Sequence, residues 1–182
     1  RTTKSAWPLR GAGIPICEGS TCEDPGYLDW LLQLRATGFE IGFHMATFHS
    51  SLREETIAGL DRFERVFGAS PACMANHVGC LENIYWGSHR LTGVNRQIYN
   101  LLTRFRRRRI SFGHVKEDQH FWGDVCQARI KYVRNFVFPE MNTLEVCPFM
   151  PYRDPKRPFV NAWYASSEGA VVESFTKCIN EK

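Results

Sequence analysis

The strongest constraint on the fold is an alternation of helical and strand patterns between residues 24 and 76. Asp24 is a typical N-cap and Pro25 a typical first helical residue, and the apolar helical face that follows ends before Gly38. Residues 39–43 (Phe-Glu-Ile-Gly-Phe) then predict a short strand. The first unit of the alternation is therefore a helix followed by a strand.

The second unit repeats this order. Residues 51–54 (Ser-Leu-Arg-Glu) resemble a capping box and predict the start of a helix, with Ser51 as its N-cap, and Gly68 predicts its end. Apolar residues spaced by three and four mark the buried side of that helix, namely Ile57, Leu60, Phe63 and Phe67. Residues 73–76 predict a buried strand. A strand-to-strand period of about 30 residues is typical of βαβ units, so we expect a parallel sheet covered by helices.

The pattern is less regular outside this region. It predicts a polar and aromatic loop at 77–90, a helix at 92–108 with Ile98, Leu101, Leu102 and Phe105 buried, and strands at 110–113, 132–138 and 159–164. We expect the end of a strand and then a loop at 1–22, an irregular proline-rich loop at 148–158, and a helix at 168–180. No repeat or linker marks a boundary, so residues 1–182 are expected to form a single domain.

The net charge of +4 is modest, but part of it is concentrated at Arg104 and Arg106–Arg109. Such a cluster can bind phosphate or nucleic acid, or it can be the solvated end of a helix, where cations interact favourably with the helix dipole. The helix-end interpretation is favoured, and nucleic acid is not an expected partner. No run of about 18 apolar residues predicts a membrane span.

Seven cysteines are present, an odd number, and none forms a Cys-x-x-Cys pair. This argues against a disulfide framework or a zinc ribbon and favours free thiols in a reducing compartment such as the cytoplasm. Cys17 and Cys22 could form a bridge only if the protein were secreted. No leader segment is visible, and both ends of the sequence are interpreted as cuts, which leaves the compartment open.

Two histidines follow the strand predicted at 39–43, where parallel α/β folds carry their chemistry. His44 comes directly after the strand and His49 five residues later. Neutral imidazoles bind zinc and similar divalent metals. At this spacing the two rings would not share a face on a helix or on a strand, so only an irregular loop could bring them to one metal.

The run Gly38-Phe39-Glu40-Ile41-Gly42-Phe43-His44, with His49 and then the helix start at Leu52, resembles the second motif of the polysaccharide deacetylase family. This NodB-like family is also called carbohydrate esterase family 4. The resemblance covers mainly residues 25–75. It implies an α/β fold, here an incomplete (β/α)7 barrel of the glycoside hydrolase/deacetylase type, and a metal-dependent hydrolase that removes acetyl groups from an acylated sugar.

The resemblance also implies a divalent metal, usually zinc, which polarises the acyl carbonyl and activates a water. Only His44 and His49 carry over as metal ligands. The family has an Asp-Asp pair on its first strand, an Arg near the position of Asn76 and a late strand-borne His, and none of these is found here. The family usually has three residues between its histidines, whereas this sequence has four. Truncation of the first and last strands, or divergence, would explain these departures.

Three functional hypotheses remain open from the sequence. The first is a deacetylase-like hydrolase acting on a carbohydrate, with Asn76, His77 and Trp122 as candidate substrate contacts and with its catalytic residues unassigned. The second is a non-catalytic carbohydrate-binding or scaffold protein on the same fold. The third is an anion or nucleic-acid binder using Arg104–Arg109. No Walker-type phosphate loop and no Gly-x-Ser-x-Gly elbow occurs, which argues against a P-loop nucleotide-binding protein and a serine hydrolase.

Overall fold

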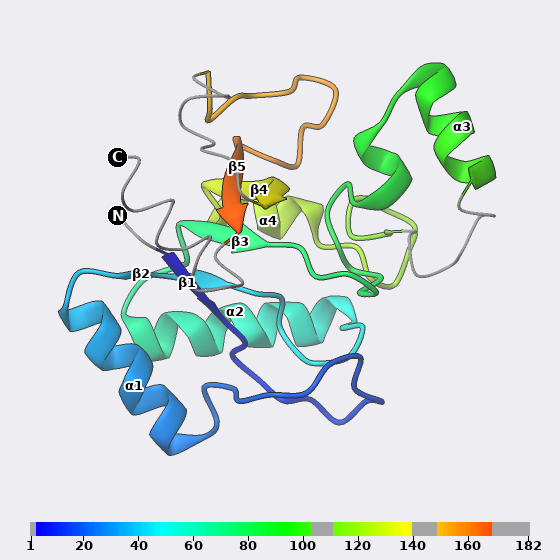
Figure 1. Cartoon of the computed structure of the whole chain (residues 1–182). Coiled ribbons are helices and arrows are strands. Elements are labelled where there is room, and N and C mark those ends of the chain that lie inside the picture. The colour runs from blue at the N-terminus through cyan, green and yellow to red at the C-terminus, as the bar shows by residue number, and fades with distance from the viewer. Residues whose placement is uncertain (1–2, 103–110, 140–148, 169–182) are drawn as a thin grey trace.

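The computed structural model describes residues 3–102, 111–139 and 149–168. Its elements, in chain order, are β1 (Thr3–Ala6), α1 (Pro25–Ala36), β2 (Glu40–Phe43), α2 (Arg53–Phe67), β3 (Cys73–Ala75), η1 (Gly87–Arg90), α3 (Gly93–Leu102), α4 (Gly123–Arg129), β4 (Tyr132–Pro139) and β5 (Trp163–Glu168) (Figure 1). Residues 169–180 of the helix expected at 168–180, the arginine cluster at 104–109 and the buried position of Phe105 lie outside the described residues, so these expectations stay predictions. Glu168 itself is the last residue of β5.

All five strands are parallel, and they lie in the order β1-β2-β3-β4-β5. Neighbours in the sheet are therefore also neighbours along the chain, an arrangement that places the connecting helices on one face when every crossover is right-handed. The expected α/β fold with a parallel sheet is confirmed. Among the described strands, β1 and β5 are the two edges, and closure into a barrel stays a proposal.

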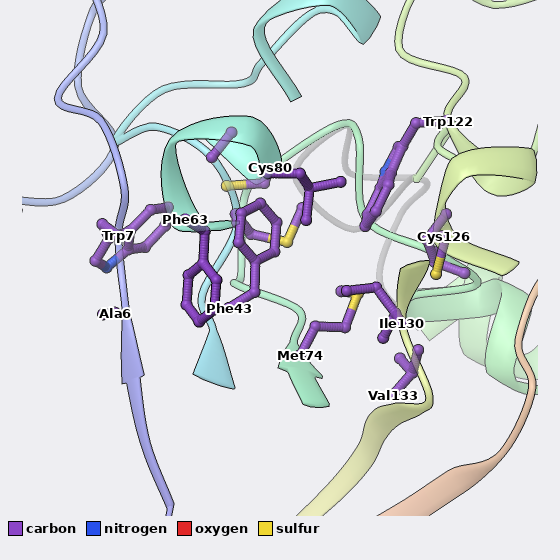
Figure 2. Packing of buried hydrophobic residues seen from close by; sticks show 14 of the residues in the cluster. Ala6, Trp7, Phe43, Phe63, Met74, Cys80, Trp122, Cys126, Ile130 and Val133 are labelled. Carbon is purple, nitrogen blue, oxygen red and sulfur yellow. The ribbon is translucent and has the colours of Figure 1, made fainter. Parts of the chain in front are cut away.

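The hydrophobic core lies between the sheet and the helices. Phe43, Met74, Val133 and Trp163 are consecutive partners across β2, β3, β4 and β5, and all four are buried. Helices α1, α2 and α4 pack on this row through Leu31, Leu60, Phe63, Phe67 and Cys126. Figure 2 shows Phe43 and Phe63 beside Met74, with Trp122 and Cys126 further along the same cluster. This apolar layer covers one face of the sheet, so polar functional groups can lie only on the other face.

The two predicted helices of the 24–76 region form, with one correction at a helix start. Asp24 is the N-cap of α1, with Pro25 at its first position, as predicted. The N-cap of α2 is Leu52 and not Ser51. The Glu55 carboxylate accepts the Leu52 amide at 2.8 Å, while the Ser51 hydroxyl pairs with Thr47 at 2.8 Å. Ser51 is thus held by the preceding loop, and the carboxylate supplies the cap from inside the helix.

Several predictions after residue 76 are wrong. Helix α3 forms, but Ile98, Leu101 and Leu102 are exposed. Residues 111–113 are not a strand, because their polar groups bond the 81–86 loop instead: the Phe112 amide donates to the Leu81 carbonyl at 2.6 Å. The last described strand begins at Trp163 and not at residue 159, and α4 was not predicted.

Two further strand predictions agree with the structure. The predicted strand at 132–138 is confirmed as β4, and the strand end predicted near the N-terminus is β1, which pairs with β2 along its whole length. The expected loop at 77–90 includes the 3₁₀ turn η1. None of the helices in the described ranges is long and apolar enough to cross a membrane.

Candidate functional site

The face of the sheet opposite the core carries polar side chains. Since neighbouring residues in a parallel sheet point the same way, the row after Phe43 and Met74 faces away from the helices. In that row Arg134 pairs with Ala75 on one side and with Tyr164 on the other. His44 follows Phe43 directly and extends the row past β2. We call this surface the polar face; its central residues are Ser5, His44, Cys73, Arg134 and Tyr164.

His44, at the carboxyl edge of the sheet, is held in place by a hydroxyl group and an aromatic ring. Its Nδ1 lies 3.1 Å from the hydroxyl of Ser5 on β1, and its ring stacks on Trp7 with centroids 4.8 Å apart. Burial lowers the pKa of His44 to about 3, helped by its neighbours His77, Arg134 and Lys4. The imidazole is therefore neutral at physiological pH, the form that binds metals and accepts protons.

His77 brings a second imidazole to the same place from the end of β3. Its ring centroid is 5.3 Å from that of His44 and 5.2 Å from that of Trp7. Its Nδ1 is buried and has no hydrogen-bond partner among the described residues. Burial again lowers the pKa, although a hydrogen bond at Val78 opposes the shift. A buried nitrogen without a partner is costly unless a ligand or water satisfies it.

Two asparagines hold the loop that carries His77. The Asn76 amide bonds both backbone groups of Ile84, at 3.1 and 2.9 Å, and the Asn83 amide bonds both backbone groups of His77, at 2.6 and 3.1 Å. Asn76 is buried, and both polar atoms of its amide are used by Ile84. It positions the loop, whereas the sequence suggested that it would contact substrate.

His49 occupies a different environment from His44. Its ring is buried under the backbone of Gly11 and Gly13, where an added Cβ would come within 2.4 and 2.5 Å of it. Its Nδ1 lies 3.0 Å from the carbonyl of Ser50, and its Nε2 lies 3.3 Å from a carboxylate oxygen of Glu55, without hydrogen-bond geometry. None of these neighbours is a neighbour of His44, so the predicted pair is not brought together.

Trp122 is a core residue. It is fully buried, its ring packs against Phe43, and its indole nitrogen donates to the Glu82 carbonyl at 2.6 Å (Figure 2). The aromatic ring beside the two histidines is instead Trp7. No pattern in the sequence singled out Trp7, because it lies in a stretch that was expected to be a loop.

A small cavity opens on the polar face. It measures about 130 Å³ and is lined by Thr3, Ser5, Gly42, Phe43, Cys73, Met74, Ala75, Arg134 and Tyr164. Burial raises the pKa of the Cys73 thiol to about 12, so it is protonated at physiological pH and is a poor nucleophile. The cavity therefore offers hydrogen-bonding groups and the guanidinium of Arg134, but no activated nucleophile.

The donor set decides which metal site this arrangement could hold. Across the described ranges, no group of three or more His, Cys, Asp and Glu side chains is placed to bind one ion. His49 does not fit the role of a metal ligand, because its ring is enclosed by the loop that contains Gly11 and Gly13. The ring centroids of His44 and His77 are 5.3 Å apart, a separation compatible with two imidazoles on one tetrahedral ion at metal–nitrogen distances of about 2.0–2.1 Å.

Comparison with protein-family models, with curated proteins and with solved structures finds no match for this chain.

Proposed function

We propose that this protein is a metal-dependent hydrolase-like protein acting on an acylated carbohydrate, on a barrel-type α/β fold. The deacetylase resemblance of residues 38–49 suggests the reaction. The observation that carries the proposal is the pair of His44 and His77, with ring centroids 5.3 Å apart at the carboxyl ends of β2 and β3. In this proposal His77 takes the role that the sequence suggested for His49.

The surroundings of His44 suit a metal ligand. If Nδ1–H donates to the Ser5 hydroxyl, 3.1 Å away, the tautomer is fixed and the lone pair of Nε2 is left for the ion. Trp7 restricts both rings from one side. Two protein ligands leave coordination positions open for water and for the substrate carbonyl.

When bound, a zinc ion would polarise the acyl carbonyl and lower the pKa of a coordinated water. The chain itself contributes two oriented neutral imidazoles and a shielding indole. Arg134 and Lys4 place positive charge near His44. Because a cation is opposed by these neighbours, we expect weaker zinc affinity than in closed structural sites with four protein ligands.

Zinc binding by single variants tests the assignment. We expect His44→Ala and His77→Ala each to weaken zinc binding at least tenfold in isothermal titration, because each removes one of two nitrogen ligands. His49→Ala is the matched control and should keep the wild-type affinity. Release of acetate from N-acetylglucosamine oligomers should fall in His44→Ala and His77→Ala, which bind zinc more weakly, and should stay at the wild-type level in His49→Ala. Loss of zinc binding in His49→Ala with retention in His77→Ala would overturn the assignment.

A non-catalytic carbohydrate-binding or scaffold protein is the second candidate. It is favoured by the absence of a carboxylate ligand and of a third metal-binding side chain from the described part of the site. It predicts that the wild-type protein binds acetylated oligosaccharides without zinc and releases no acetate. Zinc-dependent acetate release that is lost in His44→Ala would exclude it.

A further inference from the structure

The candidate site has a positive charge that no anionic side chain of the described residues pairs with. Arg134 is half-buried on the polar face and makes no hydrogen bond or ion pair through its side chain with any described residue. The register pairs Arg134 with Ala75, the residue after Met74, so Arg134 lies in the row of the sheet that His44 extends past β2. An imidazole is neutral or positive, so neither His44 nor His77 can balance the charge of the guanidinium.

The carboxylate of Glu40, on the same face of β2 as His44, is hydrogen-bonded to another residue. Glu40 lies at the opposite end of β2 from His44 and accepts a hydrogen bond from Thr3 at 3.4 Å. The register places Thr3 opposite Glu40 and Ser5 opposite Gly42, so the row of Arg134 is further toward the carboxyl edge. Arg134 therefore faces a cavity lined with side-chain hydroxyls rather than an acidic partner.

The cavity matches a small anionic group. Its volume of about 130 Å³ is too small for a whole sugar but has room for one carboxylate or phosphate group. The lining includes hydroxyls from Ser5 and Tyr164, which can donate hydrogen bonds. The planar fork of an arginine pairs with two oxygens of a carboxylate or phosphate at once.

We propose that Arg134 and this cavity bind an anionic substituent of the substrate, so that the sugar acted on at His44 is an acidic one. The inference rests on the proposed function for the identity of the ligand as a sugar. It makes Arg134 a specificity group that contacts the substrate away from the acyl carbon. The anionic substituent would supply the negative charge that no described residue provides beside this guanidinium.

Matched sugars test this preference. N-acetylmuramic acid and N-acetylglucosamine share the acetamide and differ in a carboxylate-bearing substituent, and N-acetylglucosamine 6-phosphate supplies a phosphate. We expect the wild-type protein to bind at least one acidic sugar roughly tenfold or more tightly than the neutral one, the effect of one charge-assisted hydrogen-bonded pair. The identity of the preferred acidic sugar separates a carboxylate from a phosphate ligand.

Variants of Arg134 complete the test. Arg134→Gln should abolish the acidic preference, and Arg134→Lys, which keeps the charge without the fork, should retain part of it. Lys116→Gln, at an exposed position, removes the same charge as a control and should change nothing. Circular dichroism checks the fold of each variant. Equal binding of acidic and neutral sugars by the wild type, binding of neither, or an unchanged preference in Arg134→Gln would overturn the inference.

This outcome is separable from that of the proposed function. His77→Ala should lose zinc yet keep the preference for the acidic sugar, whereas Arg134→Gln should keep zinc and lose the preference. A wild-type protein that prefers acidic sugars but binds no zinc would refute the metal assignment alone.

Discussion

The most unusual single residue is Glu82, a fully buried carboxyl group in the loop between β3 and η1. Burial raises its pKa to about 7, although the Ser51 amide and hydroxyl oppose the shift. Neither carboxylate oxygen has a hydrogen bond of normal geometry with the described residues. A buried carboxylate without a full set of donors disfavours the charged form, so this residue makes the folded state sensitive to pH.

The sign of this sensitivity follows from the raised pKa. The pKa of Glu82 is about 7 in the folded protein against an ordinary 4.5. The stabilising contribution of this group to the free energy of unfolding is therefore fully present below pH about 4.5 and is lost as the pH rises through 7. The difference corresponds to about 3 kcal/mol once the group is fully ionised. We expect Glu82→Gln to remove this loss, so the variant should be more stable than wild type at pH 8.5.

Urea unfolding of wild type and Glu82→Gln at pH 5 and pH 8.5 measures the effect. Other groups titrate equally in both proteins, so the change in their difference between the two pH values isolates Glu82. A difference that stays constant with pH would show that the carboxyl group ionises freely in the folded state.

Sequence reasoning singled out both imidazoles of the proposed site, but it paired His44 with His49 as metal ligands and gave His77 only as a candidate substrate contact. His44 and His77 each follow a predicted strand. Both were candidates because functional residues of parallel α/β folds lie at the carboxyl ends of the strands. His49 looked equivalent because it is near His44 in sequence. Its environment is set by Gly11 and Gly13, more than 30 residues earlier in the chain, and no local pattern reveals such a contact.

At the scale of elements, the loop after β1 that contains Gly11 and Gly13 packs over the ring of His49. The Ile16 amide donates to the Phe48 carbonyl at 2.6 Å and the Leu9 amide to the Ala46 carbonyl at 3.1 Å, so the loop lies along the segment that carries His49. An added Cβ at Gly13 would lie 2.5 Å from the His49 ring. The ring can lie under this loop only because no side chain is present there.

We therefore expect Gly13→Ala to destabilise the protein by about 1–3 kcal/mol, the usual cost of overpacking a filled site. Gly26→Ala is the matched control: Gly26 is in α1, and an added Cβ meets nothing within 4 Å. That control should be neutral or stabilising by up to about 1 kcal/mol. Thermal or urea unfolding measures both, and a Gly13→Ala protein as stable as the Gly26→Ala control would show that the loop moves away freely.

The elements that could be predicted are those with long-period apolar patterns or strong end signals. α1, α2, β2, β3 and β4 belong to this group. The segment after residue 76 could not be predicted well, because its structure depends on loop-to-loop hydrogen bonds such as Trp86 with Ser111, at 2.9 Å, rather than on periodicity. Helix α3 shows the opposite case: its apolar pattern predicted a buried side, but Ile98, Leu101 and Leu102 are exposed.

At the scale of the whole molecule, ion pairs and core packing both join α2 to α4, but they contribute unequally to the free energy of unfolding. Arg53 makes two contacts of 2.7 Å with Asp124, and Arg129 contacts Asp61 and Glu64 at 2.6 and 2.7 Å. The carboxylates of these pairs are about half exposed, so each pair contributes about 0–1 kcal/mol. The buried aromatic residues between the same elements therefore dominate.

Trp122 is the clearest of these aromatic residues because it joins α4, the sheet and the 77–90 loop. We expect Trp122→Phe to cost about 1–3 kcal/mol for the lost hydrogen bond to the Glu82 carbonyl, and more for lost packing against Phe43. Against a typical total stability of about 5–15 kcal/mol, this is a large change. Trp30→Phe is the control, because Trp30 is 43% exposed and its replacement should stay within about 0.5 kcal/mol.

The same pair of variants separates a core role from a ligand role. If Trp122 contacted substrate, as the sequence suggested, Trp122→Phe would weaken sugar binding while the unfolding midpoint stayed near that of Trp30→Phe. Its complete burial argues for the reverse, because a ring with no exposed surface cannot reach a ligand while its indole nitrogen donates within the core. We therefore expect a lower unfolding midpoint in urea and, under conditions where the variant is folded, the wild-type affinity for acetylated sugars.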